Sequence, residues 1–227
     1  MFAGHIGVAL AIGRVERRVN VGAFVAASLL LDAVLWLCVL LGWERVEIPA
    51  DFARTHQPRF EFPLSHGLLA ALMWSAFAAA LAWGALPALR GSRWRAAALL
   101  AAAVFSHWLL DALVHRPEMP LAGAASPMVG FGLWDAMPVA LLIEAALAVT
   151  GLSLFAAGAN WSRQRSLMLT ALVLIVLTFT VVGMTVAPPP PSAQTMAASS
   201  LVTIAVVCGL FAWLGRSATR PFTVPTA

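Results

Sequence analysis

The sequence predicts an all-α fold: a polytopic membrane helical bundle of about six transmembrane helices, preceded by a short N-terminal half-inserted helix. Two observations support this prediction. Hydrophobic residues make up 61% of the chain and charged residues only 11%, which is more apolar side chain than a soluble core can use. The apolar residues also form runs of about 20, the helical length that crosses a hydrocarbon layer about 30 Å thick.

The predicted helices follow these apolar runs in order. Residues 1–13, which include His5, form a run that at about 1.5 Å per residue is too short to cross a bilayer, so we expect a half-inserted helix. Six full spans are expected, at residues 21–42, 64–86, 96–115, 133–157, 167–186 and 198–214.

The placement of basic residues predicts the orientation. The chain has 14 basic residues, and all are Arg. Short basic links lie at residues 14–18, 90–95, 163–165 and 216–220, and alternate crossings bring all four to one side. That side, with the C-terminus, is expected to be cytoplasmic, because cytoplasmic loops carry an excess of Lys and Arg. The net positive charge therefore reflects topology, and no nucleic-acid partner is predicted.

One stretch, residues 106–121, carries the clearest chemical pattern. His107, Asp111 and His115 follow one another at four-residue steps, so a helix places all three on one face. An imidazole and a carboxylate one turn apart can bind the same divalent cation. The alternative is a helix end at which His107 hydrogen-bonds Asp111 and His115 marks the return to water.

The membrane setting favours the metal interpretation. Depth counting at about 1.5 Å per residue gathers several ionisable residues into one slab of the bilayer: His5, Asp32, His107, Asp111 and Glu144. Three others lie nearer the outer rim: His66, His115 and Asp135. An uncompensated carboxylate at mid-bilayer costs about 2.5–3.5 kcal/mol, and no predicted span supplies an Arg to pair with it. The carboxyl groups are either protonated or share one or two divalent ions with the histidines, and we favour the ions.

These residues also resemble a known family. The motifs are Gly4-His5, Leu31-Asp32, Ser65-His66, Ser106-His107-Trp108-Leu109-Leu110-Asp111 and His115-Arg116-Pro117-Glu118. Over about residues 1–150, the chain resembles the YdjM-like (LexA-binding, inner-membrane-associated) family of metal-dependent hydrolases. More distantly, it resembles the zinc-dependent phospholipase C and nuclease superfamily.

The resemblance implies a bacterial inner-membrane location, a divalent metal cofactor (zinc, or else manganese) and five metal ligands: His5, Asp32, His66, His107 and Asp111. Asp32 and Asp111 would also take part in catalysis. Relatives often have further acidic and histidine ligands near the position of Asp32, which this chain lacks. Four residues are candidates to complete the ligand set or to form its rim: His115, Glu118, Asp135 and Glu144.

The predicted function is hydrolysis of a phosphoester, or of another ester, in a lipid-like substrate by a metal-activated water. The expected partner is a membrane lipid or a lipid-linked molecule. We expect residues 1–157 to form the metal-site domain and residues 158–227 to add two scaffold spans. Two alternatives stay open: a proton- or ion-coupled transporter that uses midplane carboxylates, and a non-catalytic membrane scaffold with a structural ion.

Overall fold

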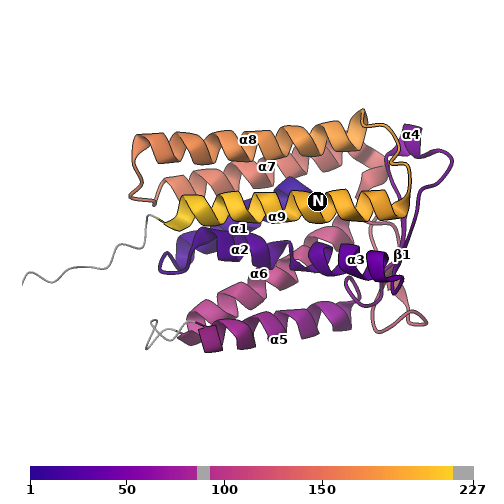
Figure 1. Cartoon of the computed structure of the whole chain (residues 1–227), viewed down its shortest axis with the longest axis horizontal. Helices are drawn as coiled ribbons and strands as arrows, with labels where there is room; N and C mark the ends of the chain where they lie inside the picture. The colour runs from indigo at the N-terminus through magenta and orange to yellow at the C-terminus, as the bar shows by residue number, and fades with distance from the viewer. Residues whose placement is uncertain (86–92, 217–227) are drawn as a thin grey trace, which may run out of the picture.

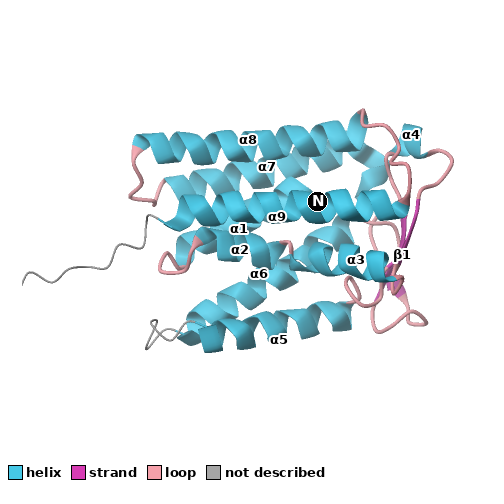
Figure 2. Cartoon of the chain, viewed as in Figure 1, coloured by secondary structure: helices cyan, strands magenta, loops and turns pink. Residues whose placement is uncertain are grey.

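The computed structural model describes residues 1–85 and 93–216, which form a bundle of helices running mostly along the long axis of the molecule (Figure 1). The helices are α1 (Phe2–Val15), α2 (Val21–Ser28), α3 (Leu30–Leu41), α4 (Phe52–Thr55), α5 (Leu68–Ala85), α6 (Arg93–Val114), α7 (Met137–Ala156), α8 (Arg163–Thr185) and α9 (Ala193–Arg216), with a 3-10 turn η1 (Leu133–Ala136) before α7. Two antiparallel ribbons pair β1 (Arg45–Glu47) with β2 (Arg59–Glu61) and β3 (Met119–Pro120) with β4 (Met128–Val129) (Figure 2).

The long helices are those of a membrane protein. Five of them, α5, α6, α7 with η1, α8 and α9, are long and apolar enough to cross a membrane, and the bent pair α2 and α3 passes the same test when taken as one span. Only 17% of the most apolar stretch of α5 is buried, and its surface exposes Leu69, Leu72, Met73 and Phe77. Because such a surface is stable only against other apolar groups, it indicates contact with lipid. The predicted all-α bundle with a short apolar first helix is confirmed.

α1 lies inside the bundle, where it contacts α2, α6, α7 and α8. Glycines allow its closest crossing, with α7, because a Cβ atom added to Gly151 would collide with the backbone carbonyl of Gly7. This close approach buries most of α1, including His5. The short N-terminal helix thus carries an ionisable side chain into the centre of the bundle.

The first full span is broken at Leu29. The axes of α2 and α3 differ by 50°. The last bond of α2 runs from the Leu29 N–H to the Val25 carbonyl, and the helical bonds resume at the Leu29 carbonyl, which accepts from the Ala33 N–H. The carbonyl of Ser28 therefore lies at a helix end, where it is free to accept a bond from another element.

The second span begins later than predicted. The sequence places His66 in its first turn, which is wrong, because α5 starts at Leu68 and His66 lies in the turn before it. Among the predicted basic links, Arg90 and Arg220 lie outside the described residues.

The connections gather at two ends of the bundle (Figure 1). One end, here called the cavity end, holds β1, α4 and the segments 42–67, 115–132 and 186–192. The other, here called the arginine end, holds the links 16–20 and 157–162, the start of α6 and the end of α9. This separation is the one that the arginine pattern predicts. Which end faces the cytoplasm stays a prediction.

Candidate metal centre

The five predicted metal ligands converge in the interior near the cavity end. His5 comes from α1, Asp32 from α3, His66 from the turn before α5, and His107 and Asp111 from α6. Their donor atoms form two groups, each with all its atoms within 4.8 Å of one another: His5, Asp32 and His107, and His66, His107 and Asp111. All are buried except Asp32, which is partly exposed. We call these five residues the His/Asp cluster.

Asp111 lies at the centre of this arrangement. Its Oδ2 atom is 3.1 Å from Nε2 of His107, 3.4 Å from Nε2 of His66 and 3.6 Å from Nε2 of His115. Its Oδ1 atom is 3.1 Å from Nε2 of His5. One buried carboxylate therefore faces four imidazoles, and no ion pair in the described part of the chain joins it to an Arg.

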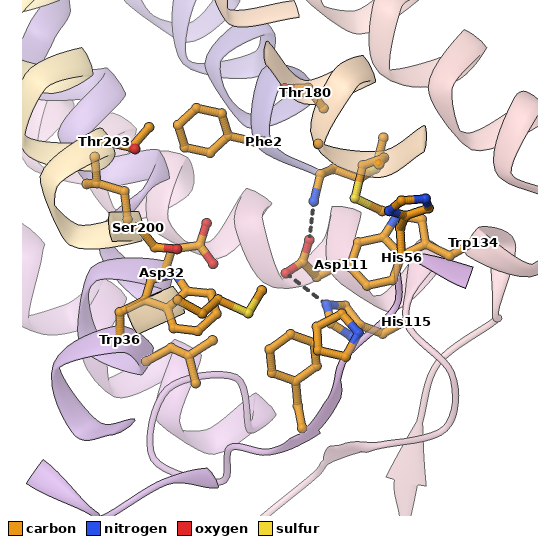
Figure 3. Close-up of a pocket in the computed structure, with 18 of the residues that line it drawn as sticks. Phe2, Asp32, Trp36, His56, Asp111, His115, Trp134, Thr180, Ser200 and Thr203 are labelled. Atoms are coloured by element: carbon orange, nitrogen blue, oxygen red, sulfur yellow. Dashed lines mark hydrogen bonds and ion pairs between the residues drawn. The ribbon is translucent and has the colours of Figure 1, made fainter. Parts of the chain in front are cut away.

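Asp111 also contacts the N-terminal amino group, and Asp32 contacts two of the same histidines. The Met1 amino group lies 3.1 Å from Oδ1 of Asp111, and Figure 3 draws this contact. Oδ1 of Asp32 lies 3.7 Å from Nε2 of both His66 and His107. The second carboxylate thus approaches the same two imidazole nitrogens from another side.

Neighbouring groups hold the outer nitrogens of His107 and His115. Nδ1 of His107 is 2.6 Å from the Ser28 carbonyl. Because a carbonyl only accepts hydrogen bonds, this Nδ1 carries a proton, and the ring turns Nε2 toward Asp111. Nδ1 of His115 bonds Oε1 of Glu118 at 2.7 Å. Burial disfavours protonation of His115, but its bonds with Asp111 and Glu118 outweigh burial and raise its pKa.

A network of hydrogen bonds fixes the turn that carries His66. Nδ1 of His66 is 2.9 Å from the Ser65 hydroxyl, and the indole of Trp108 donates to the His66 carbonyl at 3.0 Å. The Glu44 carboxylate accepts from the N–H groups of Leu64 and Ser65, at 2.8 and 2.9 Å. Burial raises the pKa of Glu44 despite these bonds. These hydrogen bonds orient a turn that has no regular secondary structure.

The geometry of the cluster suits a metal ion. Nε2 of His66 and Nε2 of His107 are 3.1 Å apart. In a tetrahedral zinc site with bonds of about 2.0–2.1 Å, neighbouring ligand atoms lie about 3.3 Å apart. Nδ1 of His5 is buried without a hydrogen-bond partner, so the cluster also holds an unsatisfied donor or acceptor. Imidazoles and carboxylates are ligands of divalent transition metals, and the His/Asp cluster can hold such an ion.

Two of the candidate additional ligands do not join the cluster. Asp135 is exposed and pairs with Arg116 at 2.7 Å, so it lies at the rim. Glu144 is buried, but its Oε1 atom accepts from the N–H groups of Ala3 and Gly4, at 2.7 and 3.3 Å. Glu144 therefore caps the first turn of α1, and it belongs to neither group of candidate metal ligands. Depth counting along the helices could not tell which way Glu144 faces.

A cavity of about 490 Å³ opens beside the cluster (Figure 3). Polar residues of the site form part of its wall: Asp32, His66, Asp111 and His115. Most other lining residues are apolar, among them Phe2, Leu35, Trp36, Phe60, Phe62 and Trp134. α8 and α9 close one side with residues that include Phe179, Thr180, Met184, Ser200, Thr203 and Ile204. The two spans predicted as scaffold thus contribute to the wall of the candidate site.

Sequence reasoning missed His56. This side chain lines the same cavity, is 8% exposed, and has a buried Nδ1 without a partner. Its φ of 51° is the one positive value among the described non-glycine residues. The available signal was weak, because a single histidine in a polar loop has no helical spacing to mark it. An unsatisfied ring in a left-handed conformation is typical of a functional position.

The fold and the cluster together define a class: a helical membrane protein whose buried histidines and aspartates can hold a metal ion beside a largely apolar cavity. No family model matches the chain, and searches of the curated proteins and of the solved structures give no significant match. The resemblance to the YdjM-like hydrolases stays a prediction from the motifs.

Proposed function

We propose that this protein is an integral membrane hydrolase that uses a divalent metal to cleave a phosphoester, or another ester, in a lipid-like substrate. The observation that carries the proposal is the orientation of three imidazoles. His66, His107 and His115 each turn Nε2 toward Asp111 while Nδ1 contacts a hydroxyl, a carbonyl or a carboxylate. Metal-binding histidines typically have such a partner on the second nitrogen, which fixes the tautomer and the ring orientation.

The donor set suits zinc or manganese, and an ion bound there supplies Lewis acidity and a water of lowered pKa. Asp32 is the partly exposed carboxylate on the cavity wall, so we assign it the proton that the attacking water loses. Asp111, which Nε2 of His66 and Nε2 of His107 both face, would be a ligand whose negative charge offsets that of the ion. The water oxygen bonds to the phosphoryl or acyl centre, the bond from that centre to the leaving oxygen breaks, and Asp32 passes its proton to the leaving oxygen.

The walls of the cavity support a lipid-like substrate. Phe2, Leu35, Phe179 and Ile204 surround the space beside Asp32 and Asp111 with apolar surface. Such walls bind hydrocarbon chains and exclude bulk water from the reacting centre. We place the protein in a bacterial inner membrane with its arginine end in the cytoplasm, which puts the cavity at the outer leaflet.

Metal content tests the proposal first. Elemental analysis of protein purified in detergent is expected to find about one or two equivalents of zinc or manganese, lost in His107→Ala and in Asp111→Ala. Asp135→Asn is the matched control, because Asp135 pairs with Arg116 at the surface and should not affect the metal. Circular dichroism and size-exclusion chromatography check that each variant remains folded.

Activity then separates the alternatives. The metal-loaded wild type is expected to cleave bis(p-nitrophenyl) phosphate or phosphatidylglycerol in micelles, and Asp111→Ala is not. A folded wild type that binds no added metal contradicts the hydrolase and favours proton-coupled transport. Bound metal without hydrolysis of any phosphoester or carboxylic ester tried favours a structural ion.

A further inference from the structure

A second cavity lies at the arginine end, away from the His/Asp cluster. Its volume is about 280 Å³, and it lies between the 16–20 link, the connection from α7 to α8, and the last turn of α9. The polar residues in its wall are Arg17, Asn20, Asn160 and Arg165, beside the indole of Trp161. In Figure 1 the connection from α7 to α8 marks this end of the bundle.

This cavity is positively charged and has no acidic residue in its wall. Glu16 is the acidic residue of the neighbouring link, and it already binds Arg18 through two hydrogen bonds of 2.8 Å. No ion pair or hydrogen bond to a carboxylate reaches Arg17 or Arg165 within residues 1–85 and 93–216. The guanidinium of Arg165 instead lies over the ring of Trp161, with Cζ 5.5 Å from the centroid.

A third guanidinium group strengthens the charge. A Cβ atom added to Gly158 would collide with the guanidinium groups of both Arg14 and Arg17, so these two groups lie against the same glycine. Like charges held this close repel each other unless an anion lies between or beside them. The absence of a side chain at Gly158 is what allows both groups to approach.

We propose that this cavity binds a phosphate group, either in the headgroup of an anionic phospholipid or in a soluble phosphate. Guanidinium groups bind phosphate through paired, charge-assisted hydrogen bonds. The N-terminus of α8, which begins at Arg163 and is capped by Ser162, adds partial positive charge on the same side. Trp161 suits the headgroup level of a membrane, where indole rings are enriched.

The site is independent of the proposed hydrolase. It lies at the far end of α1 from His5, uses no residue of the His/Asp cluster, and would bind its ligand whether or not the protein is an enzyme. A lipid bound here would fix the 16–20 link against the connection from α7 to α8. The chemistry is the same for both sources of phosphate, so the experiment must distinguish them.

The test is native mass spectrometry of the full chain in a neutral detergent, with phosphatidylglycerol and phosphatidylcholine added in equal amounts. The wild type is expected to retain one phosphatidylglycerol at least tenfold more tightly than phosphatidylcholine. The double variant Arg17→Gln with Arg165→Gln should lose that preference. The matched control, Arg93→Gln with Arg163→Gln, removes the same charge at the same end but outside the cavity and should keep it.

A second arm adds inorganic phosphate and follows the thermal unfolding midpoint. A rise in the midpoint for the wild type but not for Arg17→Gln with Arg165→Gln, together with no lipid preference, assigns the site to a soluble phosphate. Equal retention of the two lipids by the wild type with no effect of phosphate overturns the proposal. Retention of phosphatidylglycerol that falls equally in both double variants also overturns it, because the binding would then follow net charge alone.

Discussion

Near the cavity end of the bundle the histidines and aspartates of the His/Asp cluster point inward and meet, whereas at the arginine end several arginines lie at the surface. Asp111 is buried among four imidazoles with no Arg beside it. At the other end Arg14, Arg17 and Arg18 are exposed. The buried Asp111 has one ammonium partner, the Met1 amino group, and several imidazoles around it that can share a further cation. Exposed arginines are instead solvated by water and attract mobile anions. The difference predicts a resident cation at one end and an exchangeable anion at the other.

The largest expected effect comes from removing the central charge. Asp111→Asn keeps the shape of the side chain but removes its negative charge. We expect zinc affinity, measured by competition with a chromophoric chelator, to fall by more than about 100-fold, because outer-sphere partners alone account for about 10–100-fold. Arg18→Gln at the opposite end should leave the affinity unchanged. Equal zinc affinities for the wild type and Asp111→Asn would contradict the prediction that the cavity end holds a cation through Asp111.

A smaller effect is expected from the second carboxylate partner of His115. Glu118→Gln weakens the acceptor that holds Nδ1 of His115, at 2.7 Å. We expect metal affinity to fall about 10-fold, at the low end for an outer-sphere partner, since the amide oxygen still accepts one hydrogen bond. The same competition assay measures it. An affinity loss as large as that of Asp111→Asn would mean that Glu118 is itself a ligand.

His56 lines the cavity but does not belong to the His/Asp cluster, so its substitution should affect stability and not metal binding. Its left-handed backbone is acceptable to Gly or Asn but costs Ala about 1 kcal/mol. We expect the thermal unfolding midpoint to rank His56→Asn and His56→Gly above His56→Ala, with the metal content of all three equal to that of the wild type. Loss of metal in a folded His56→Asn would extend the cluster to this loop.

The smallest effect is expected at the arginine end, where the buried carboxylate of Glu16 pairs with the exposed Arg18. Hydrogen bonding to Arg18 lowers the pKa of Glu16, so the pair contributes stability above the unfolded pKa of about 4.3 and loses it as the pH falls through the lower folded pKa. Glu16→Gln is expected to cost about 0.5 kcal/mol at pH 7 and nothing at the acid limit. Urea unfolding at a series of pH values measures this. A cost that is the same at every pH would show that charge is not involved.

Much of the fold follows from composition, because each long helix presents apolar side chains to lipid and therefore appears in the sequence as a continuous run of apolar residues. The break at Leu29 does not. The surrounding residues include no Gly or Pro that would interrupt a helix, and the carbonyl at the bend is bonded by a partner 79 positions away, Nδ1 of His107. Such a contact has no local signature.

Helical spacing predicts part of the site, and the family motifs point to His5, Asp32 and His66, which also converge in the structure. His107 and Asp111 share a helix face by their four-residue step, and both lie in the cluster. Glu144 has a suitable depth, but depth does not determine orientation, and its carboxylate caps α1. His56 comes from a loop without periodicity, so only the folded chain brings it to the cavity.

The bend at Leu29 has a further consequence. In a continuous helix the Ser28 carbonyl would also accept from the N–H four residues later, so His107 would share an acceptor that the bend leaves to it alone. The Val25 carbonyl is shared in this way, because it accepts from both the Leu29 N–H and the Ser28 hydroxyl. The kink therefore gives the Nδ1 proton of His107 an undivided acceptor, and a substitution that straightens the α2–α3 junction should weaken the bond that orients this imidazole.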